Sequence, residues 1–294
     1  MSVATLPSDD AVQEPAPRSS PVRAEGRAEL RFARRGADTR LSHLYQRDPC
    51  RVLFPNVQAG EPPLGVIVTT SGGVVGGDSL TYSIHAGRRT GCTVTTQAAE
   101  KIYRSDGAAS TIEVRLRAGA DAACEWVPQE TILFDRARLR RATTVDLGPR
   151  ARLIAGEMVV FGRAAHGERV LDGLLHDSWR VRRSGRLVWA DAMALDGDIG
   201  GTMAHPAAFG GAAAVATMIY CGEDAPARVD AVRAALSAVA SGCRAGTSCI
   251  GEVLVTRILG VDIVTVREAF AGLWARLRSE AMGRAPRTPR LWNM

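Results

Sequence analysis

Residues 87–97 read Gly-Arg-Arg-Thr-Gly-Cys-Thr-Val-Thr-Thr-Gln, and two later segments repeat the spacing of this stretch. The positions that correspond are Gly87, Cys92 and Gln97, then Gly119, Cys124 and Gln129, then Gly148, Leu153 and Met158. The starting glycines are 32 and then 29 residues apart. Strand-rich units of this length cannot bury an apolar face alone, so they stack on one another. The repeat predicts a mainly β fold of stacked, β-helix-like strand layers.

Period-two alternation extends this interpretation from Leu30 to about Leu195. Apolar and polar side chains alternate clearly in residues 79–85 and 112–117, as in strands with one buried face. A hairpin is expected around Ser184-Gly185, where a turn separates two strand-like runs. The central part of the chain is therefore expected to contain strands only.

Helical periodicity begins only after Gly222. We expect two α-helices near the C-terminus, at residues 226–240 and from about Thr265, where a capping box fits, to Gly283, with a strand at Ile250–Leu259 between them. Apolar residues at steps of three and four should pack on the β body: Val229, Val232, Leu236 and Val239 in the first helix, and Phe270, Leu273, Trp274 and Leu277 in the second. Residues 1–28 are rich in Pro, Ser, Ala and Glu and are expected to be a disordered tail, followed by a single domain over 29–294.

Composition excludes several classes of protein. The net charge of +6 comes from scattered arginines, with Lys101 the only lysine, and few aromatics accompany them, so nucleic-acid binding is not expected. The longest apolar run, residues 212–220, is too short to span a membrane, and no signal sequence is found. Six cysteines without a Cys-x-x-Cys pair argue against a zinc ribbon or a thioredoxin. We therefore expect a cytoplasmic protein with reduced thiols.

The glycine-rich stretch Ser71–Asp78 does not match a phosphate-binding motif. It has neither the dinucleotide-binding spacing nor a Gly-Lys-Ser/Thr sequence, and a strand-like run follows it. The glycines are expected to supply turns with positive φ. Asp78 is expected to cap a turn, with a ligand role as the alternative.

Polar residues gather in and around residues 95–104 and 126–134, more densely than a core strand should allow. Two interpretations stay open: a hydrogen-bonded ladder between layers, with Gln97 stacked near Gln129, or a polar lining that faces an internal water path or a partner. Glu157 and Glu168 flank Arg163 and would pair with it or face solvent. The candidate residues are Asp78, Thr96, Gln97, Glu100, Lys101, Tyr103, Gln129, Glu130, Glu157, Arg163 and Glu168. The histidines show no metal-ligand spacing and no nucleophile motif occurs, so no catalytic residue is assigned.

The ordered blocks resemble those of the urease accessory protein UreD (UreH) family. The resemblance rests on residues 71–78, 95–104 and 126–134, on Phe161-Gly162-Arg163 with Gly167-Glu168, and on a tail that ends Pro289-Arg-Leu-Trp292. It implies a β-rich stack with two helices. It also implies a non-enzymatic chaperone without a tightly bound cofactor, which joins UreF and the GTPase UreG on apo-urease so that nickel reaches the active site.

The residues are compatible with that implied role. Tight Cys/His sites would trap Ni²⁺, whereas Asp, Glu, Gln and Thr oxygens would let a passing ion exchange. The polar blocks would then form a nickel conduit. Two alternatives stay open: a β-helical carbohydrate-active enzyme with paired carboxylates, and a scaffold that only bridges partners.

Overall fold

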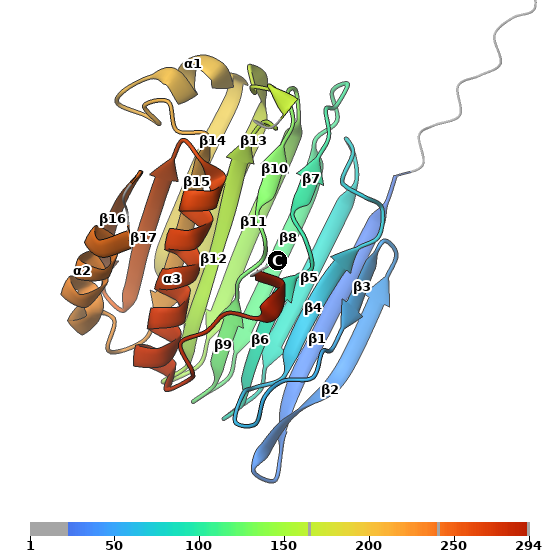
Figure 1. Cartoon of the computed structure of the whole chain (residues 1–294). Helices are drawn as coiled ribbons and strands as arrows, with labels where there is room; N and C mark the ends of the chain where they lie inside the picture. The colour runs from blue at the N-terminus through green and yellow to red at the C-terminus, as the bar shows by residue number, and fades with distance from the viewer. Residues whose placement is uncertain (1–22, 164–165, 240–241, 293–294) are drawn as a thin grey trace, which may run out of the picture.

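Two β-sheets face each other in the computed structural model of this chain, and two α-helices cover the outer side of one sheet (Figure 1). The structure describes residues 23–163, 166–239 and 242–292. One apolar core fills the space between the sheets, and a second lies between one sheet and the helices. The predicted fold class, mainly β with stacked layers and helices near the C-terminus, is confirmed.

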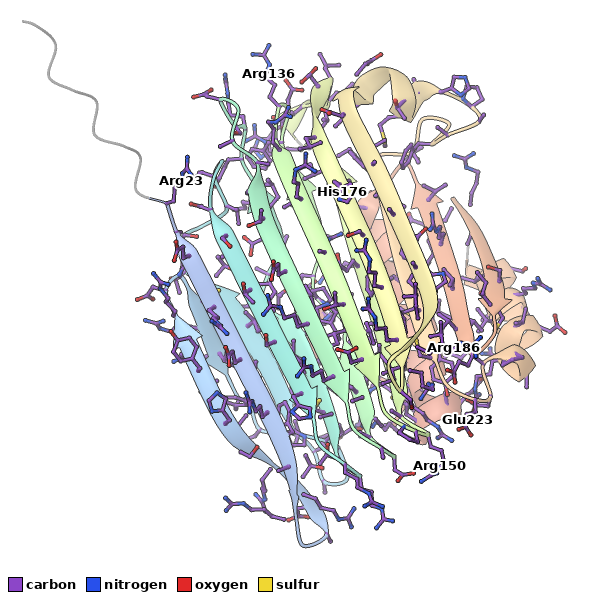
Figure 2. The ribbon with its side chains drawn as sticks, turned by 180° about the vertical axis from the view of Figure 1, so that it is seen from behind. Arg23, Arg136, Arg150, His176, Arg186 and Glu223 are labelled. Atoms are coloured by element: carbon purple, nitrogen blue, oxygen red, sulfur yellow. The ribbon has the colours of Figure 1, made fainter. Side chains whose placement is uncertain are left out.

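The first sheet has seven strands, and its central ones run parallel. Antiparallel strands close both edges. In spatial order the strands are β14 (Arg186–Asp198), β13 (Asp172–Arg183), β11 (Arg138–Leu147), β8 (Ser110–Ala118), β5 (Ser79–Ala86), β1 (Glu25–Arg35) and β2 (Asp38–Arg47). Figure 2 looks onto the outer face of this sheet. The hairpin predicted around Ser184-Gly185 is confirmed, since it joins β13 to β14.

The second sheet has ten strands. Its main path is β16 (Cys243–Ile250), β17 (Val253–Gly260), β15 (Ala214–Cys221), β12 (Arg152–Phe161), β9 (Ala123–Trp126), β6 (Gly91–Thr96), β4 (Leu64–Thr69) and β3 (Cys50–Leu53). The short strands β7 (Glu100–Ile102) and β10 (Thr131–Leu133) pair with each other, and β10 also pairs with β12. The strand expected at Ile250–Leu259 starts at Val253 instead. Ile250 ends β16, because Gly251 with φ 57° turns the chain into an antiparallel hairpin.

The sequence repeat corresponds to successive coils of this stack. Each coil leaves the seven-stranded sheet at a glycine turn, runs through the ten-stranded sheet and returns. Cys92 pairs in register with Cys124, and Cys124 with Leu153. The thiols of Cys92 and Cys124 are free and their Sγ atoms lie 3.6 Å apart. The predicted stacking of the repeats is confirmed.

Glycine is required at the turns because consecutive coils approach closely there. A Cβ atom on Gly119 would lie 2.8 Å from the backbone nitrogen of Arg88, and one on Gly148 would lie 2.7 Å from that of Ala120. Backbone hydrogen bonds join the same turns, from Gly119 N–H to Ala86 O and from Gly148 N–H to Ala118 O, both 2.8 Å long. A side chain at these positions would push neighbouring coils apart.

Three helices occur in the described residues, where two were predicted. The additional helix, α1 (Ile199–Ala204), is short and contains Gly200 and Gly201, so it lacks both helical propensity and apolar periodicity. The first predicted helix is α2 (Val229–Val239), and a 3₁₀ turn at Pro226–Arg228 precedes it. Residue 240, the predicted end of this helix, and the side chain of Val239 lie outside the described part of the chain. None of the described helices is long and apolar enough to cross a membrane.

The second predicted helix is α3 (Ile263–Met282), which ends at Gly283 as expected. It starts two residues before Thr265, because the carboxylate of Asp262 is the N-cap and accepts a hydrogen bond from Thr265 N–H at 3.1 Å. The predicted apolar stripe of α3 is fully buried on the β body. In α2, Val232 and Leu236 are buried as well.

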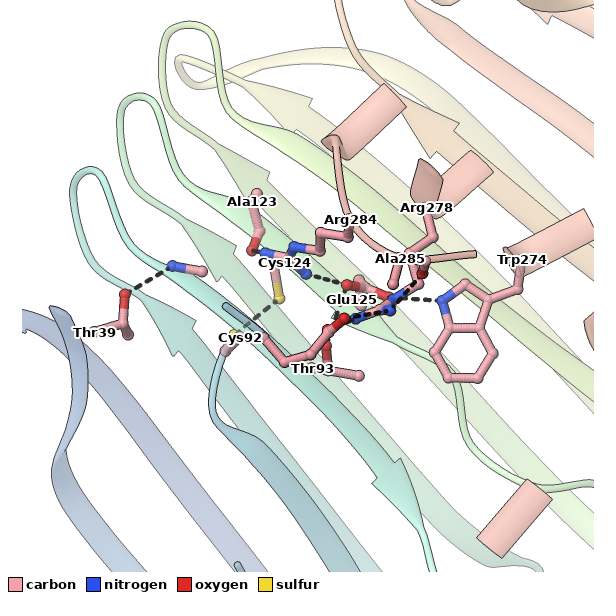
Figure 3. Close-up of polar contacts among 12 residues, drawn as sticks. Thr39, Cys92, Thr93, Ala123, Cys124, Glu125, Trp274, Arg278, Arg284 and Ala285 are labelled. Atoms are coloured by element: carbon pink, nitrogen blue, oxygen red, sulfur yellow. Dashed lines mark hydrogen bonds and ion pairs between the residues drawn. The ribbon is translucent and has the colours of Figure 1, made fainter. Parts of the chain in front are cut away.

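A buried carboxylate fixes α3 to the ten-stranded sheet (Figure 3). Glu125, on β9, is fully buried and accepts hydrogen bonds from Trp274 Nε1 at 2.7 Å and Arg278 Nε at 2.9 Å, and it pairs with Arg284. Thr93 Oγ1 donates a further bond at 3.1 Å. The C-terminal segment joins the same layer, since Trp292 stacks on Phe270 with ring centroids 5.9 Å apart.

The N-terminal boundary differs from the expectation. Residues 25–28, expected in the disordered tail, already belong to β1, and Ala28 is fully buried. They are held there because β1 pairs with both β2 and β5. The rest of the expected tail, residues 1–22, lies outside the described residues. The assignment of 29–294 to a single domain stays a prediction.

Candidate internal polar site

A small polar cavity lies between the two sheets, in the middle of the repeat region. Its volume is about 30 Å³. Both sheets contribute to its lining, which consists of Tyr82, Thr96, Glu100, Ile112, Val114, Trp126, Pro128, Gln129, Thr131, Arg141 and Glu157. Polar side chains reach this depth because they occupy inward positions of strands whose other inward positions are apolar. The cavity has room for one or two water molecules.

One side of the cavity is formed around Glu100, at the start of β7. Its Oε2 accepts a hydrogen bond of 2.6 Å from Thr69 Oγ1, on β4, and the Tyr82 hydroxyl lies 3.5 Å from the same Thr69 oxygen. Burial raises the pKa of the Glu100 carboxyl above its usual value. Burial first, and then the charge of Glu100, raise the pKa of Tyr82, so its hydroxyl stays neutral.

The opposite side contains a buried arginine with two carboxylates. Arg141, on β11, donates to Asp177 on β13 through Nε at 3.1 Å and Nη2 at 2.6 Å, and it pairs with Glu157 on β12. Its Nη1 donates to Thr131 Oγ1 at 3.0 Å, while Thr143 Oγ1 donates to Glu157 at 3.0 Å. All of these side chains are at least nine-tenths buried.

The balance of charge in this interior is negative. Three carboxylates, on Glu100, Glu157 and Asp177, share the region with the guanidinium of Arg141. Burial, opposed by Arg141 and reinforced by Asp177, raises the pKa of Glu157 to about 7. A proton on Glu157 therefore neutralises part of the excess negative charge near neutral pH, and a passing cation would neutralise it in the same way.

Two polar atoms at the cavity have neither a hydrogen-bond partner nor an ion pair in the described residues. They are Trp126 Nε1, a donor, and Gln129 Oε1, an acceptor, and both are buried; a third buried atom, Glu157 Oε2, has its ion pair with Arg141 and no hydrogen bond. Buried polar atoms of this kind are normally satisfied by ordered water. The arrangement thus suits water and an exchangeable cation bound by oxygen atoms. Among the described residues no three His, Cys, Asp or Glu side chains are placed to hold a metal ion.

Four of the predicted site residues are brought together at this cavity: Thr96, Glu100, Gln129 and Glu157. The backbone N–H of Gln129 donates to Thr96 Oγ1 at 2.8 Å, which links neighbouring coils. The expected stack of Gln97 on Gln129 is not found, because Gln97 is exposed and Gln129 is buried. Thr96 occupies the place beside Gln129 instead.

Four other candidates stabilise turns. Asp78 caps its turn as expected: its carboxylate accepts from Ala24 N–H at 2.8 Å and Val75 N–H at 3.0 Å. Tyr103 donates its hydroxyl to Gly72 O at 3.2 Å. Of the two possible partners of Arg163, Glu168 forms the ion pair, at 2.7 Å, whereas Glu157 pairs with Arg141.

The remaining candidates lie away from the cavity. Lys101 is exposed on β7, as Gln97 is in the loop before it. Glu130 is half-buried beside α3, with a carboxylate oxygen 3.6 Å from Arg267. These side chains face solvent or the helical layer and take no part in the internal polar cluster.

Sequence reasoning missed Thr69, Thr131, Arg141 and Asp177 as site residues. One signal for Arg141 was available. In β11 the inward positions are Leu139, Arg141, Thr143, Val145 and Leu147, so alternation alone places this arginine among buried residues. Asp177 follows only from the pairing of β11 with β13, in which it lies opposite Arg141.

Comparison with known proteins gives a consistent family. The family described as "UreD urease accessory protein" matches residues 24–293. A urease accessory protein UreD of Magnetococcus marinus is 47% identical over 92% of this chain and 94% of its own length. Proteins with the same name from Xanthobacter autotrophicus and Rhizobium etli are 42% and 39% identical, over 97% and 93% of this chain and 96% and 97% of their own lengths.

Proposed function

Since this chain belongs to the UreD family of urease accessory proteins, we propose that it helps insert nickel into apo-urease as part of a complex with UreF and the GTPase UreG. Its relatives are named urease accessory proteins, which supports a role in urease maturation. We further propose that it acts in the cytoplasm, is not an enzyme and keeps no resident cofactor. Nickel would be its cargo.

The internal polar cavity is the observation that supports a path for nickel. Its carboxylates outnumber its one guanidinium, and its ligand atoms are oxygens of Glu, Gln, Thr and Tyr. Oxygen ligands of this kind hold a borderline ion more loosely than thiolates or imidazoles do. A site that must release its ion needs such weak binding.

The same cavity argues against the carbohydrate-active alternative. Glu100 and Glu157 line a space of only about 30 Å³ between the sheets. A sugar ring does not fit there, and a glycosidase needs its two carboxylates on either side of the bond it cleaves. The scaffold alternative predicts instead that the cavity residues serve stability alone.

Deleting the gene tests the proposed function. We expect a strain without this protein to make normal amounts of urease protein that is inactive and poor in nickel, because apo-urease then lacks its maturation complex. Urease activity, urease protein and bound nickel are measured in parallel, and restoring the gene is the control. Full activity in the deletion strain at ordinary nickel concentrations would contradict the proposal.

Glu100→Gln tests the conduit. This change keeps the shape of the side chain and removes one carboxylate from the cavity. We expect urease activation to fall by roughly tenfold, the lower end of the cost of losing a group around a metal, while the soluble yield and the pull-down of UreF and UreG stay normal.

Asp78→Asn is the matched control, because this carboxylate caps a turn outside the cavity. We expect Asp78→Asn to lower soluble yield and activation together, since losing a buried hydrogen bond costs about 1–3 kcal/mol. Normal activation by Glu100→Gln would exclude its carboxylate from the path. If Glu100→Gln lowers the soluble yield, or no longer pulls down UreF and UreG, then Glu100 stabilises the fold or the complex, as the scaffold alternative requires.

A further inference from the structure

The outer face of the seven-stranded sheet is open to solvent over its central strands (Figure 2). Helices α2 and α3 lie on the ten-stranded sheet, and α1 contacts β13 and β14, at one edge of the seven-stranded sheet. No described element covers the outward side chains of β8 and β11. This face differs from the interior described above, since it contributes no residue to the cavity.

Arginines dominate the outward positions of β8, β11 and β13. They are Arg115, Arg117, Arg138, Arg140, Arg180 and Arg182. Outward carboxylates on the same three strands are those of Glu113, Asp146 and, at the first residue of β13, Asp172. We call these six arginines the arginine face.

Half of the arginine face is paired and half is not. Arg115 pairs with Glu113, Arg117 lies 3.7 Å from Asp146, and Arg138 lies 3.7 Å from Asp196. Within residues 23–163, 166–239 and 242–292, the guanidinium groups of the other three, Arg140, Arg180 and Arg182, have no hydrogen bond or ion pair with an acidic side chain. Unpaired positive charge thus gathers along β11 and β13.

Strand register places these charges on one continuous surface. In the pairing of β11 with β13, Arg140 lies opposite His176, and Arg180 lies opposite Thr144. Arg182 lies opposite Asp146 of β11. Asp146 also lies opposite Arg117 of β8, and its carboxylate is close to that arginine. Neighbouring strands are about 4.8 Å apart. Many of the flanking outward residues are small: Ser and Thr on β5, and Ala190, Ala192 and Ala194 on β14, which are followed there by the acidic Asp196 and Asp198. The face is therefore flat and accessible to a broad partner.

We propose that the arginine face docks an acidic surface of a partner protein. Guanidinium groups form bidentate hydrogen bonds with carboxylates, and an excess of positive charge steers an acidic partner toward the sheet. The aromatic residues of these strands, Tyr82, Trp179 and Trp189, are buried on the inner side. The face thus lacks the stacking platforms of single-stranded nucleic-acid binders. The inference does not depend on the urease role.

The test compares two triple variants of equal net charge. The first is Arg140→Gln, Arg180→Gln and Arg182→Gln, on the face. The control is Arg40→Gln, Arg136→Gln and Arg233→Gln, which removes three exposed arginines that do not belong to the arginine face. The full-length proteins are titrated at low salt with labelled poly-L-glutamate, a duplex DNA and vesicles containing phosphatidylserine, after equal thermal unfolding midpoints have been verified.

We expect the wild type and the control to bind poly-L-glutamate alike, and the face variant to bind roughly tenfold more weakly, which corresponds to three exposed ion pairs. Added salt should remove the difference. Equal weakening in both triple variants would overturn the proposal, because net charge alone would explain it. So would the absence of binding by the wild type, or face-dependent binding of DNA or vesicles that is tighter than that of poly-L-glutamate.

Discussion

Trp274→Ala should lower the free energy of unfolding by about 3–5 kcal/mol, the range for truncating a buried aromatic side chain. Trp274 is fully buried between α3 and the ten-stranded sheet. Its ring contacts Trp292, with centroids 5.3 Å apart, and its Nε1 donates to the buried Glu125 at 2.7 Å. The substitution creates a cavity and removes a donor from an enclosed carboxylate. Chemical denaturation followed by circular dichroism measures the change.

Trp274→Phe is the matched control for Trp274→Ala. It keeps one six-membered ring and removes the pyrrole part of the indole with its donor to Glu125, so we expect a smaller loss, of about 1–3 kcal/mol. The difference between the two variants measures the contribution of the six-membered ring that phenylalanine retains. A loss below about 1 kcal/mol for Trp274→Ala would show that this face of α3 does not stabilise the β body, contrary to the burial seen here.

The stacked fold could be predicted because its signals are local. The glycines at 87, 119 and 148 mark turns that only a residue without a side chain permits, and alternation in single strands marks their buried faces. Helix α3 was predicted for the same reason, since one stripe of its own residues is buried. Helix α1 gave no such signal, because two of its six residues are glycine.

The internal site could be predicted only in part. Thr96, Glu100, Gln129 and Glu157 were found because they lie in polar blocks of sequence. Their common cavity depends on parallel pairing between strands about 30 residues apart, which no local pattern fixes. The burial of Glu125 could not be predicted from local sequence either. It alternates with the inward Cys124 and Trp126, so local reasoning would place it in solvent, yet α3 covers it completely.

Arg141→Met should cost about 3–5 kcal/mol near pH 8, because it removes one partner of a buried ion pair. The side chains of Glu157 and Asp177 would then face each other without a cation, and Thr131 would lose its donor. Methionine is similar in length and carries no charge, so the cost comes chiefly from the uncompensated carboxylates. Chemical denaturation over a range of pH measures it.

The cost of Arg141→Met should shrink as the pH falls, and this pH dependence identifies its cause. Burial already raises the pKa of Glu157 to about 7, above the unfolded value of 4.5, and losing the cation raises it further. The folded state then holds a proton that the unfolded state releases, so stability is greatest below pH 4.5 and falls as the pH rises through the folded pKa. Arg141→Met should therefore be least destabilised near pH 5.

Glu157→Gln tests this explanation because it removes the titrating group. In that background Arg141→Met should cost less near pH 8 than it does alone, and the cost should depend little on pH between 5 and 8, since Asp177 is then the one ion-pair partner of Arg141 that remains. Asp146→Asn, on the outward face of β11, is the control and should leave the pH profile of Arg141→Met unchanged.

A penalty for Arg141→Met that is the same at pH 5 and pH 8 would mean that lost packing, and not the negative charge of the interior, sets the cost. A pH-dependent penalty would establish the excess negative charge at the cavity, which is the property that a path for a divalent cation requires.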